Sequence, residues 1–245
     1  MKILHCIVTL LLFLPMMPGE GSPYPEKSTG EYKKHKNRRL DLIATFLPEN
    51  PVFFEAGGHY GHDTVKMSAH WPKGRLIAFE PNPHAFQMFE KNTIGCQNVE
   101  GYNLAVNNYN GTATLYVCYG TEGNNPEYEG ASSLLEPSEM MEIHYRGPRI
   151  EVPCVILDDW CKANAVDHID FMWLDLEGLE LQVLTSSPHI LDTVQVIYTE
   201  TNFMEFRKGM TQYKELETFL ESQGFKMVAH WYLEGLQGDA IFIRE

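Results

Sequence analysis

The segment Phe53–Thr64, FFEAGGHYGHDT, constrains the fold of this chain more than any other part of the sequence. It consists of the end of an apolar strand, the acidic residue Glu55, and a turn that contains Gly57 and Gly61. Glycine lets the backbone turn sharply and come close to a ligand, and the helix expected after the turn presents free N–H groups at its start. Such a strand–turn–helix unit is typical of α/β domains that bind a nucleotide-type cofactor.

A second acidic strand end follows about twenty residues after the glycine turn. The strand 75–79, RLIAF, runs directly into Glu80, and a carboxylate at this place can accept hydrogen bonds from ribose hydroxyls. The two motifs together indicate a ribose-containing cofactor. The glycine turn lacks the G-x-G-x-x-G pattern of dinucleotide-binding proteins, and no Lys-Ser or Lys-Thr follows it, which excludes a P-loop.

Strands and helices alternate through most of the chain, which predicts an α/β fold. The expected strands are 52–56, 75–80, 99–106, 112–117, 150–156, 169–174 and 194–199, and the clearest helices lie near 61–70, 83–92 and 213–223. This alternation predicts a mostly parallel sheet with helices on both faces. The last two strands, 225–231 and 239–243, have no helix between them, so one of them is expected to be antiparallel.

Acidic side chains recur at the carboxyl ends of the predicted parallel strands, where an open α/β sheet binds its ligand. They are Glu55, Glu80, Asp175, Glu177 and Glu200. Each alone could cap a helix or favour its dipole, but carboxylates gathered at one edge repel each other and lose hydration. The set therefore predicts a binding site. The sequence assigns no metal ligand, although a divalent ion held by Asp175, Glu177 and Glu200 stays open because hard cations bind carboxylate oxygens.

The segment 119–150 is long, polar and rich in glycine and proline. Inside a compact domain, such a segment is usually a lid over the active site or a disordered insertion, and both alternatives stay open. As a lid it would cover the acceptor. Its aromatic and polar side chains suit a hydroxylated molecule such as a sugar: Tyr119, Tyr128, Ser132, Ser133, His144, Tyr145 and Arg146.

Charge and the N-terminal segment limit where the protein acts and on what. The net charge of −14 argues against a nucleic-acid partner, since binding to phosphates needs a basic face. Residues 1–22 carry Lys2 and then an apolar run of the size found in signal peptides. The basic cluster 33–39 would resist translocation, so export and a short membrane anchor with a cytoplasmic domain both stay open. We expect a linker and an N-terminal helix over 23–50 and one domain over 51–245.

The motifs, taken together, resemble the FkbM-type methyltransferases, a branch of the class I S-adenosylmethionine-dependent enzymes. The matching elements are FFEAGGHYGHDT (53–64), IAFEPNP (77–83), NLAV (103–106) and VILDDW to IDFMWLDLEGLELQVL (155–184). The last is the most specific, and the resemblance covers roughly 52–245. It implies a Rossmann-like class I fold with a seven-stranded, mostly parallel sheet, an antiparallel C-terminal strand, and S-adenosylmethionine as the cofactor.

The same resemblance implies a role for each candidate binding residue. Glu55, Gly57 and Gly61 would hold the methionine part of the cofactor, Glu80 the ribose, Asn103 and Ala105 the adenine, while Asp175 and Glu177 would face the methyl group. The chain also departs from the family pattern. Asp is more usual where Glu55 stands, Asn is common where His59 stands, and Trp173 replaces a Lys, which is expected to remove a cation from the acceptor side.

Methyl transfer to a hydroxyl benefits from a general base, and Glu177 and Glu200 are the predicted catalytic residues because both follow strands beside the cofactor. The predicted activity is O-methylation of a sugar, a glycan or another small hydroxylated acceptor. One alternative is a binding module of an exported or anchored protein that keeps the fold without catalysis. A nicotinamide-dependent oxidoreductase is a weaker alternative, since the dinucleotide pattern is missing.

Overall fold

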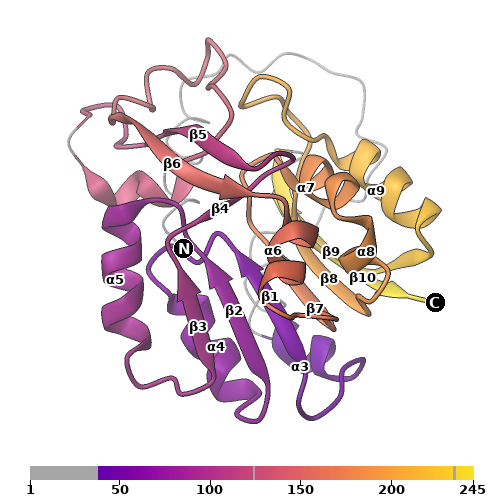
Figure 1. Ribbon diagram of the computed structural model, residues 1–245. Helices are drawn as coiled ribbons and strands as arrows, with labels where there is room; N and C mark the ends of the chain where they lie inside the picture. The colour runs from indigo at the N-terminus through magenta and orange to yellow at the C-terminus, as the bar shows by residue number, and fades with distance from the viewer. Residues whose placement is uncertain (1–37, 124, 234–235) are drawn as a thin grey trace.

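The computed structural model describes residues 38–123, 125–233 and 236–245 (Figure 1). The predicted signal-type segment 1–22 lies outside the described residues, as does most of the predicted linker. Helix α3 (Arg39–Ala44) is the part of the expected N-terminal helix that the structure describes. Within the described ranges, no helix is long and apolar enough to cross a membrane. The domain boundaries drawn from the sequence stay a prediction.

A seven-stranded sheet with the order β3-β2-β1-β7-β8-β10-β9 forms the centre of the molecule. Its strands are β1 (Val52–Ala56), β2 (Arg75–Phe79), β3 (Val99–Tyr102), β7 (Phe171–Leu174), β8 (Val196–Asn202), β9 (Phe225–Leu233) and β10 (Gln237–Arg244). Every pairing is parallel except those of β10, which is antiparallel to both of its neighbours. The predicted fold class, a Rossmann-like sheet with an antiparallel C-terminal strand, is confirmed.

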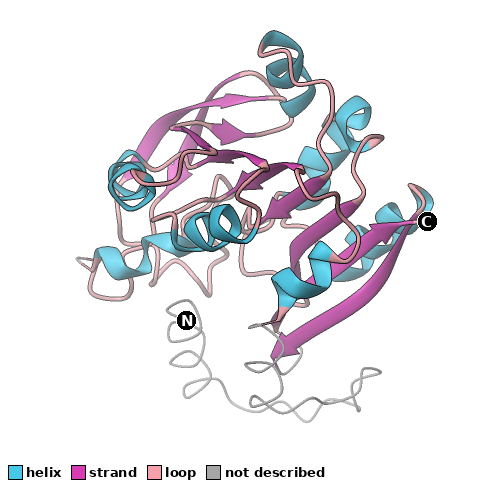
Figure 2. Ribbon diagram, turned by 90° about the horizontal axis from the view of Figure 1, so that it is seen from below, coloured by secondary structure: helices cyan, strands magenta, loops and turns pink. Residues whose placement is uncertain are grey.

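Helices cover both faces of this sheet because the central strands are apolar on both sides. Along β1 the side chains alternate: Phe54 belongs to one core and Phe53 to the other. The first core is closed by α6 (Leu157–Ala163), α7 (Glu180–Ser186), α8 (Pro188–Leu191) and α9 (Tyr213–Ser222). The second is closed by α3, α4 (His62–His70) and α5 (Pro83–Thr93). Figure 2 shows the strands running between the two groups of helices.

A second, three-stranded sheet, β4-β6-β5, lies at the carboxyl edge of the main sheet (Figure 1). It comprises β4 (Ala105–Val106), β5 (Gly111–Tyr116) and β6 (Arg149–Val155). The prediction of one continuous strand over 99–106 is therefore wrong, because β3 joins the main sheet and β4 joins the small one. The chain turns between them where Asn103 Nδ2 donates to the carbonyl oxygens of Glu80 and Pro81, at 2.8 and 3.0 Å.

The segment 119–150 connects β5 to β6, and apart from residue 124 the structure describes it. It contains a 3₁₀ helix, η1 (Pro126–Ala131). Bridges at Tyr116–Ser133 and Pro137–Arg207 tie it to β5 and to the loop after β8. The alternative of a disordered insertion does not hold for the described part, which packs over the carboxyl ends of the parallel strands.

Candidate active site

A cavity of about 810 Å³ lies at the carboxyl edge of the main sheet, between the strand ends and the segment 119–150. This volume is in the range of pockets that hold cofactors. Six of the nine predicted site residues line it: Glu55, Gly57, Glu80, Ala105, Asp175 and Glu177. Gly61, Asn103 and Glu200 are not part of its wall.

The turn after β1 is shaped so that the backbone itself forms part of the cavity wall. Gly57 has a φ of 91°, and the N–H groups of Gly57 and Gly58 both donate to the carbonyl of Phe79 at 3.0 Å. A Cβ on Gly57 would collide with the backbone carbonyl of Asp175. Only glycine therefore lets β1 and β7 come this close while leaving room for a ligand.

Gly61 plays a packing part at the start of α4. It is the N-cap of the helix with a φ of 76°, and a Cβ there would lie 2.9 Å from Thr93 Cγ2 and 3.2 Å from Phe89 Cδ2. Glycine is thus required for α4 to pack on α5. Its predicted contact with the cofactor stays a prediction.

Glu80 is fixed by the backbone on both sides. Its Oε2 accepts the N–H of His59 and its Oε1 accepts the N–H of Asn82, each at 2.7 Å. Burial raises the pKa of Glu80 to about 7, against the effect of these two donors. Each oxygen keeps a second lone pair, so the carboxylate can still accept hydrogen bonds from ribose hydroxyls.

Glu55 is buried below the glycine turn and tied to helix α4. Its Oε2 accepts a hydrogen bond from Thr64 Oγ1 at 2.6 Å. Burial raises the pKa of Glu55 to about 8, because removal from water disfavours the charged form. Glu55 is therefore poised to lose a proton when a positively charged ligand group comes near.

Trp173, which stands where the family pattern has Lys, packs against a cationic side chain. The guanidinium of Arg39, from α3, lies 4.4 Å from the centre of the Trp173 ring. Arg39 also forms an ion pair with Asp63 at 2.9 Å and donates to the hydroxyl of Tyr198 at 3.3 Å. Arg39 is not part of the cavity wall, so the expected loss of a cation on the acceptor side stays a prediction.

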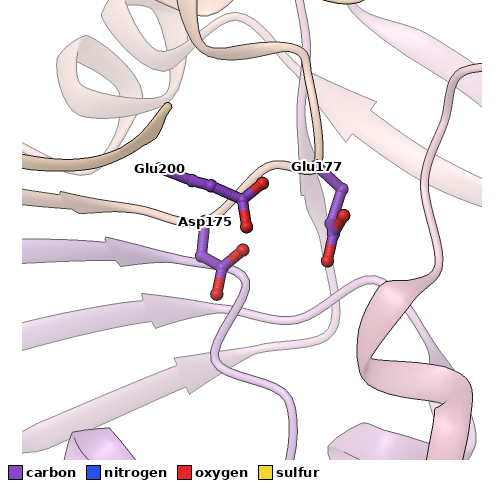
Figure 3. A group of neighbouring side chains, drawn as sticks. All are labelled: Asp175, Glu177 and Glu200. Atoms are coloured by element: carbon purple, nitrogen blue, oxygen red, sulfur yellow. The ribbon is translucent and has the colours of Figure 1, made fainter. Parts of the chain in front are cut away.

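Three carboxylates converge where β7 and β8 end, and we call Asp175, Glu177 and Glu200 the acidic cluster (Figure 3). One oxygen of each lies within 4.8 Å of the others. Burial raises the pKa of Glu177 and, together with the charge of Glu177 itself, that of Glu200. Glu177 adopts a φ of 53°, which is uncommon for a residue other than glycine.

Arg207 is a site residue that sequence reasoning missed. It is buried in the loop after β8 and forms an ion pair with Glu177 Oε2. Its Nη2 also donates to the carbonyl of Ala131 at 2.9 Å, and its guanidinium lies 5.4 Å from the Tyr145 ring centre. Arg207 thus joins the acidic cluster to the segment 119–150. It lies in an irregular stretch of sequence with no periodic signal.

Glu129 was missed for the same reason. It lies in η1 with a fully buried side chain and accepts a hydrogen bond from Asn82 Nδ2 at 3.1 Å. His84 Nδ1 lies 2.9 Å from its Oε1. These contacts hold the segment 119–150 against the start of α5, next to Glu80. Nothing in the local sequence of Glu129 marks it as a contact residue.

The fold and the site together define a class I S-adenosylmethionine-dependent methyltransferase. The strand order, the glycine turn after β1, the acid after β2 and the cavity at the carboxyl edge are those the sequence motifs imply. The family model described as the methyltransferase FkbM domain matches residues 55–227. The chain therefore belongs to the FkbM methyltransferase family, and its methyl donor is S-adenosylmethionine.

Curated relatives agree with this assignment. The 2-O-methyltransferase NoeI of Sinorhizobium fredii is 27% identical over 236 residues, which are 95% of this chain and 93% of that protein. Methyltransferase 1 of Beauveria bassiana is 24% identical over 78% of this chain and 79% of its own length. Among solved structures, fibrillarin of Aeropyrum pernix with bound S-adenosyl-L-methionine is 11% identical, with a TM-score of 0.49 over 92% of this chain and 85% of that one.

Proposed function

We propose that this protein transfers a methyl group from S-adenosylmethionine to a hydroxyl oxygen of a sugar, a glycan or another small hydroxylated molecule. The observation that carries the proposal is the acidic cluster, two of whose carboxylates, Asp175 and Glu177, line the cofactor cavity. Carboxylates there can accept the hydroxyl proton and favour a nearby sulfonium. The 2-O-methyltransferase activity in the name of NoeI supports oxygen as the methylated atom.

The residues of the cavity fit the cofactor. Gly57 itself lines the cavity, and Glu80 offers two fixed carboxylate oxygens to ribose hydroxyls. Ala105 lines the same cavity and its small side chain leaves room for a ring. S-adenosylmethionine, when bound, supplies an activated methyl group on a positively charged sulfur.

Of the two predicted bases, Glu200 is the better proton acceptor. Glu177 is paired with Arg207, so its negative charge is already neutralised. Glu200 accepts a single long hydrogen bond, from Asn202 Nδ2 at 3.5 Å, and within the described residues no ion pair engages it. We assign Glu200 to take the proton of the acceptor hydroxyl and Glu177 to hold Arg207 in place.

The acceptor would enter past the segment 119–150. Of the residues predicted to contact it, Ser132 and Ser133 line the cavity. Tyr145 has a bracing role instead, because its hydroxyl donates to the carbonyl of Ala131 at 2.5 Å. Ser133 Oγ donates to the carbonyl of Glu177 at 3.1 Å, which joins this segment to the acidic cluster. Of the aromatic and polar residues predicted to contact the acceptor, the two serines are therefore those that we expect it to meet.

Two measurements test the proposal. Calorimetric titration with S-adenosylmethionine and S-adenosylhomocysteine should show binding that Gly57→Ala abolishes. Gly95→Ala is the matched control, because nothing lies within 4 Å of a Cβ at Gly95 and binding should be unchanged. Incubation with isotopically labelled S-adenosylmethionine and a panel of mono- and oligosaccharides should give O-methylated products. Cofactor binding without transfer to any hydroxylated acceptor would favour a binding module that has lost catalysis.

A further inference from the structure

We propose that the acidic cluster is a binding site for a hard divalent cation such as Mg²⁺ or Mn²⁺, which also binds the acceptor hydroxyl. This inference rests on the proposed O-methyl transfer and adds a metal ion to the same end of the cavity. The ligands are one carboxylate oxygen each from Asp175, Glu177 and Glu200.

The spacing of the three carboxylates suits such an ion. One oxygen of each lies within 4.8 Å of the others, and Figure 3 shows all three side chains directed into the same space. Oxygen ligands lie about 2.0–2.6 Å from Mg²⁺ or Ca²⁺, so two ligands on opposite sides of an ion are about 4–5 Å apart. An ion can therefore contact all three groups after small side-chain adjustments.

A buried oxygen in the cluster points independently to a missing ligand. Glu177 is 3% exposed, and its Oε1 has no hydrogen-bond partner among the described residues. A buried carboxylate oxygen without a donor is costly, and such an atom calls for an explanation such as a bound ion. Arg207 engages the other oxygen, Oε2. The unpartnered oxygen belongs to a carboxylate that lies beside those of Asp175 and Glu200, as Figure 3 shows.

Charge balance favours the same conclusion. Glu177 in this cluster is paired with Arg207, whereas Glu200 forms no ion pair within the described residues. Buried charges in proteins are normally paired or bound to a metal. Glu180, the nearest further acid, is committed elsewhere, because its Oε1 accepts the N–H groups of Leu176 and Gly178 at 3.1 and 3.2 Å. A divalent cation would compensate the remaining negative charge.

The ion would act on the acceptor. A hydroxyl bound to a divalent cation loses its proton more readily, because the cation stabilises the alkoxide. The O–H bond breaks and the proton passes to the second carboxylate oxygen of Glu200. The oxygen then bonds to the methyl carbon while the bond from that carbon to sulfur breaks, which leaves neutral S-adenosylhomocysteine. Since a metal ion has room for several oxygen ligands, a pair of neighbouring hydroxyls, as in a sugar, is the acceptor chemistry that this site fits best.

The direct test is Mn²⁺ binding to the metal-stripped full-length chain, measured by calorimetry and by electron paramagnetic resonance without cofactor or acceptor. We expect one site, weakened at least about tenfold by Asp175→Asn and by Glu200→Gln. Glu129→Gln is the matched control, because this carboxylate lines the same cavity but is engaged by Asn82 and His84, and it should leave Mn²⁺ binding unchanged. Absence of Mn²⁺ binding at millimolar concentration, or equal binding in wild type and Glu200→Gln, would overturn the proposal.

A second arm separates this inference from the proposed function. Treatment of the wild type with a chelator should abolish methyl transfer, and Mg²⁺ or Mn²⁺ should restore it. Transfer that survives chelation would refute the metal site and leave the methyltransferase activity intact. Mn²⁺ binding without transfer to any hydroxylated acceptor would refute the function and leave the metal site. This experiment uses wild-type protein, so it tests the metal site separately from the methyltransferase activity even if a variant does not fold.

Discussion

The carboxylates proposed to bind the ribose and those proposed to meet the acceptor differ in how many hydrogen-bond donors contact them. At the end that we propose for the ribose, Glu80 has a backbone N–H on each oxygen at 2.7 Å. At the end that we propose for the acceptor, Glu177 keeps one oxygen without a hydrogen-bond partner among the described residues. Glu200, in the same acidic cluster but not in the cavity wall, accepts one bond of 3.5 Å. The carboxylate of Glu80 is therefore held by donors of the protein itself, whereas the carboxylates of Glu177 and Glu200 still have oxygens available to a ligand. We infer that the ribose end fixes a position and that the acceptor end is where chemistry takes place.

The largest effect is expected when Glu200 is changed to Gln. The amide has nearly the same shape but cannot accept a proton, so turnover should fall by about 10²–10⁴-fold, the usual range for loss of a general base. Cofactor affinity, measured by calorimetry, should change little. Turnover equal to that of the wild type would remove Glu200 from the mechanism and with it the contrast between the two ends.

Glu177→Gln should act mainly on stability. Removing one partner of a buried ion pair costs about 3–5 kcal/mol, because Arg207 would be left as an uncompensated buried charge. Urea denaturation would measure this loss. Glu136→Gln is the control, since it breaks the exposed ion pair with Lys208 and should cost less than about 1 kcal/mol. A small cost at Glu177 together with a large loss of turnover would place Glu177 in the chemistry, either as the base or as a ligand of the proposed cation, and Mn²⁺ binding to Glu177→Gln would tell these two apart.

Much of the ribose end could be predicted from the sequence, because its contacts are local. Glu80 and the glycine turn meet through backbone groups that lie next to the two motifs, and strand alternation placed both at the same edge. The acceptor end depends on contacts between distant segments. Arg207 lies in an irregular loop and η1 in a long insertion, so no spacing or periodicity reveals that they meet at Glu177 and Ala131.

Two smaller differences between the sequence prediction and the structure also arise from contacts between distant segments. The break between β3 and β4 depends on Asn103 donating to carbonyls of the loop after β2, a contact that alternating hydrophobicity cannot show. The cation over Trp173 comes from Arg39, in a helix whose place against the sheet is set by core packing. In both cases the side chain was visible in the sequence, while its partner was fixed only by tertiary structure.

Glu80→Gln should lower cofactor affinity with little effect on the chemical step. One of the two backbone N–H donors would face the amide NH₂ group in place of an acceptor, which costs about 1–3 kcal/mol, or roughly tenfold to a hundredfold in affinity. Calorimetry with S-adenosylhomocysteine measures the change directly. Glu90→Gln, at an exposed position on helix α5, serves as the control and should bind normally. Unchanged affinity in Glu80→Gln would show that the ribose lies elsewhere.

The last prediction concerns Glu55 and the pH dependence of stability. Burial raises the pKa of Glu55 from 4.5 to about 8, so between these values the folded protein holds a proton that the unfolded chain has released. Raising the pH through this window therefore favours unfolding, by at most about 1.4 kcal/mol per pH unit for one group. The stabilising contribution is complete below pH 4.5 and lost by about pH 8.

Glu55→Gln cannot titrate, so its stability without cofactor should fall less between pH 5.5 and pH 8 than that of the wild type. Urea denaturation at the two pH values gives the difference, and Glu90→Gln should follow the wild type. Equal pH slopes in Glu55→Gln and wild type would mean that Glu55 is already ionised beside Thr64. Glu55 would then be a carboxylate stabilised by a fixed hydrogen-bond donor, as Glu80 is by two backbone N–H groups. A smaller slope would instead show that the floor of the cavity, like its acceptor end, gains its negative charge only when a positively charged ligand binds.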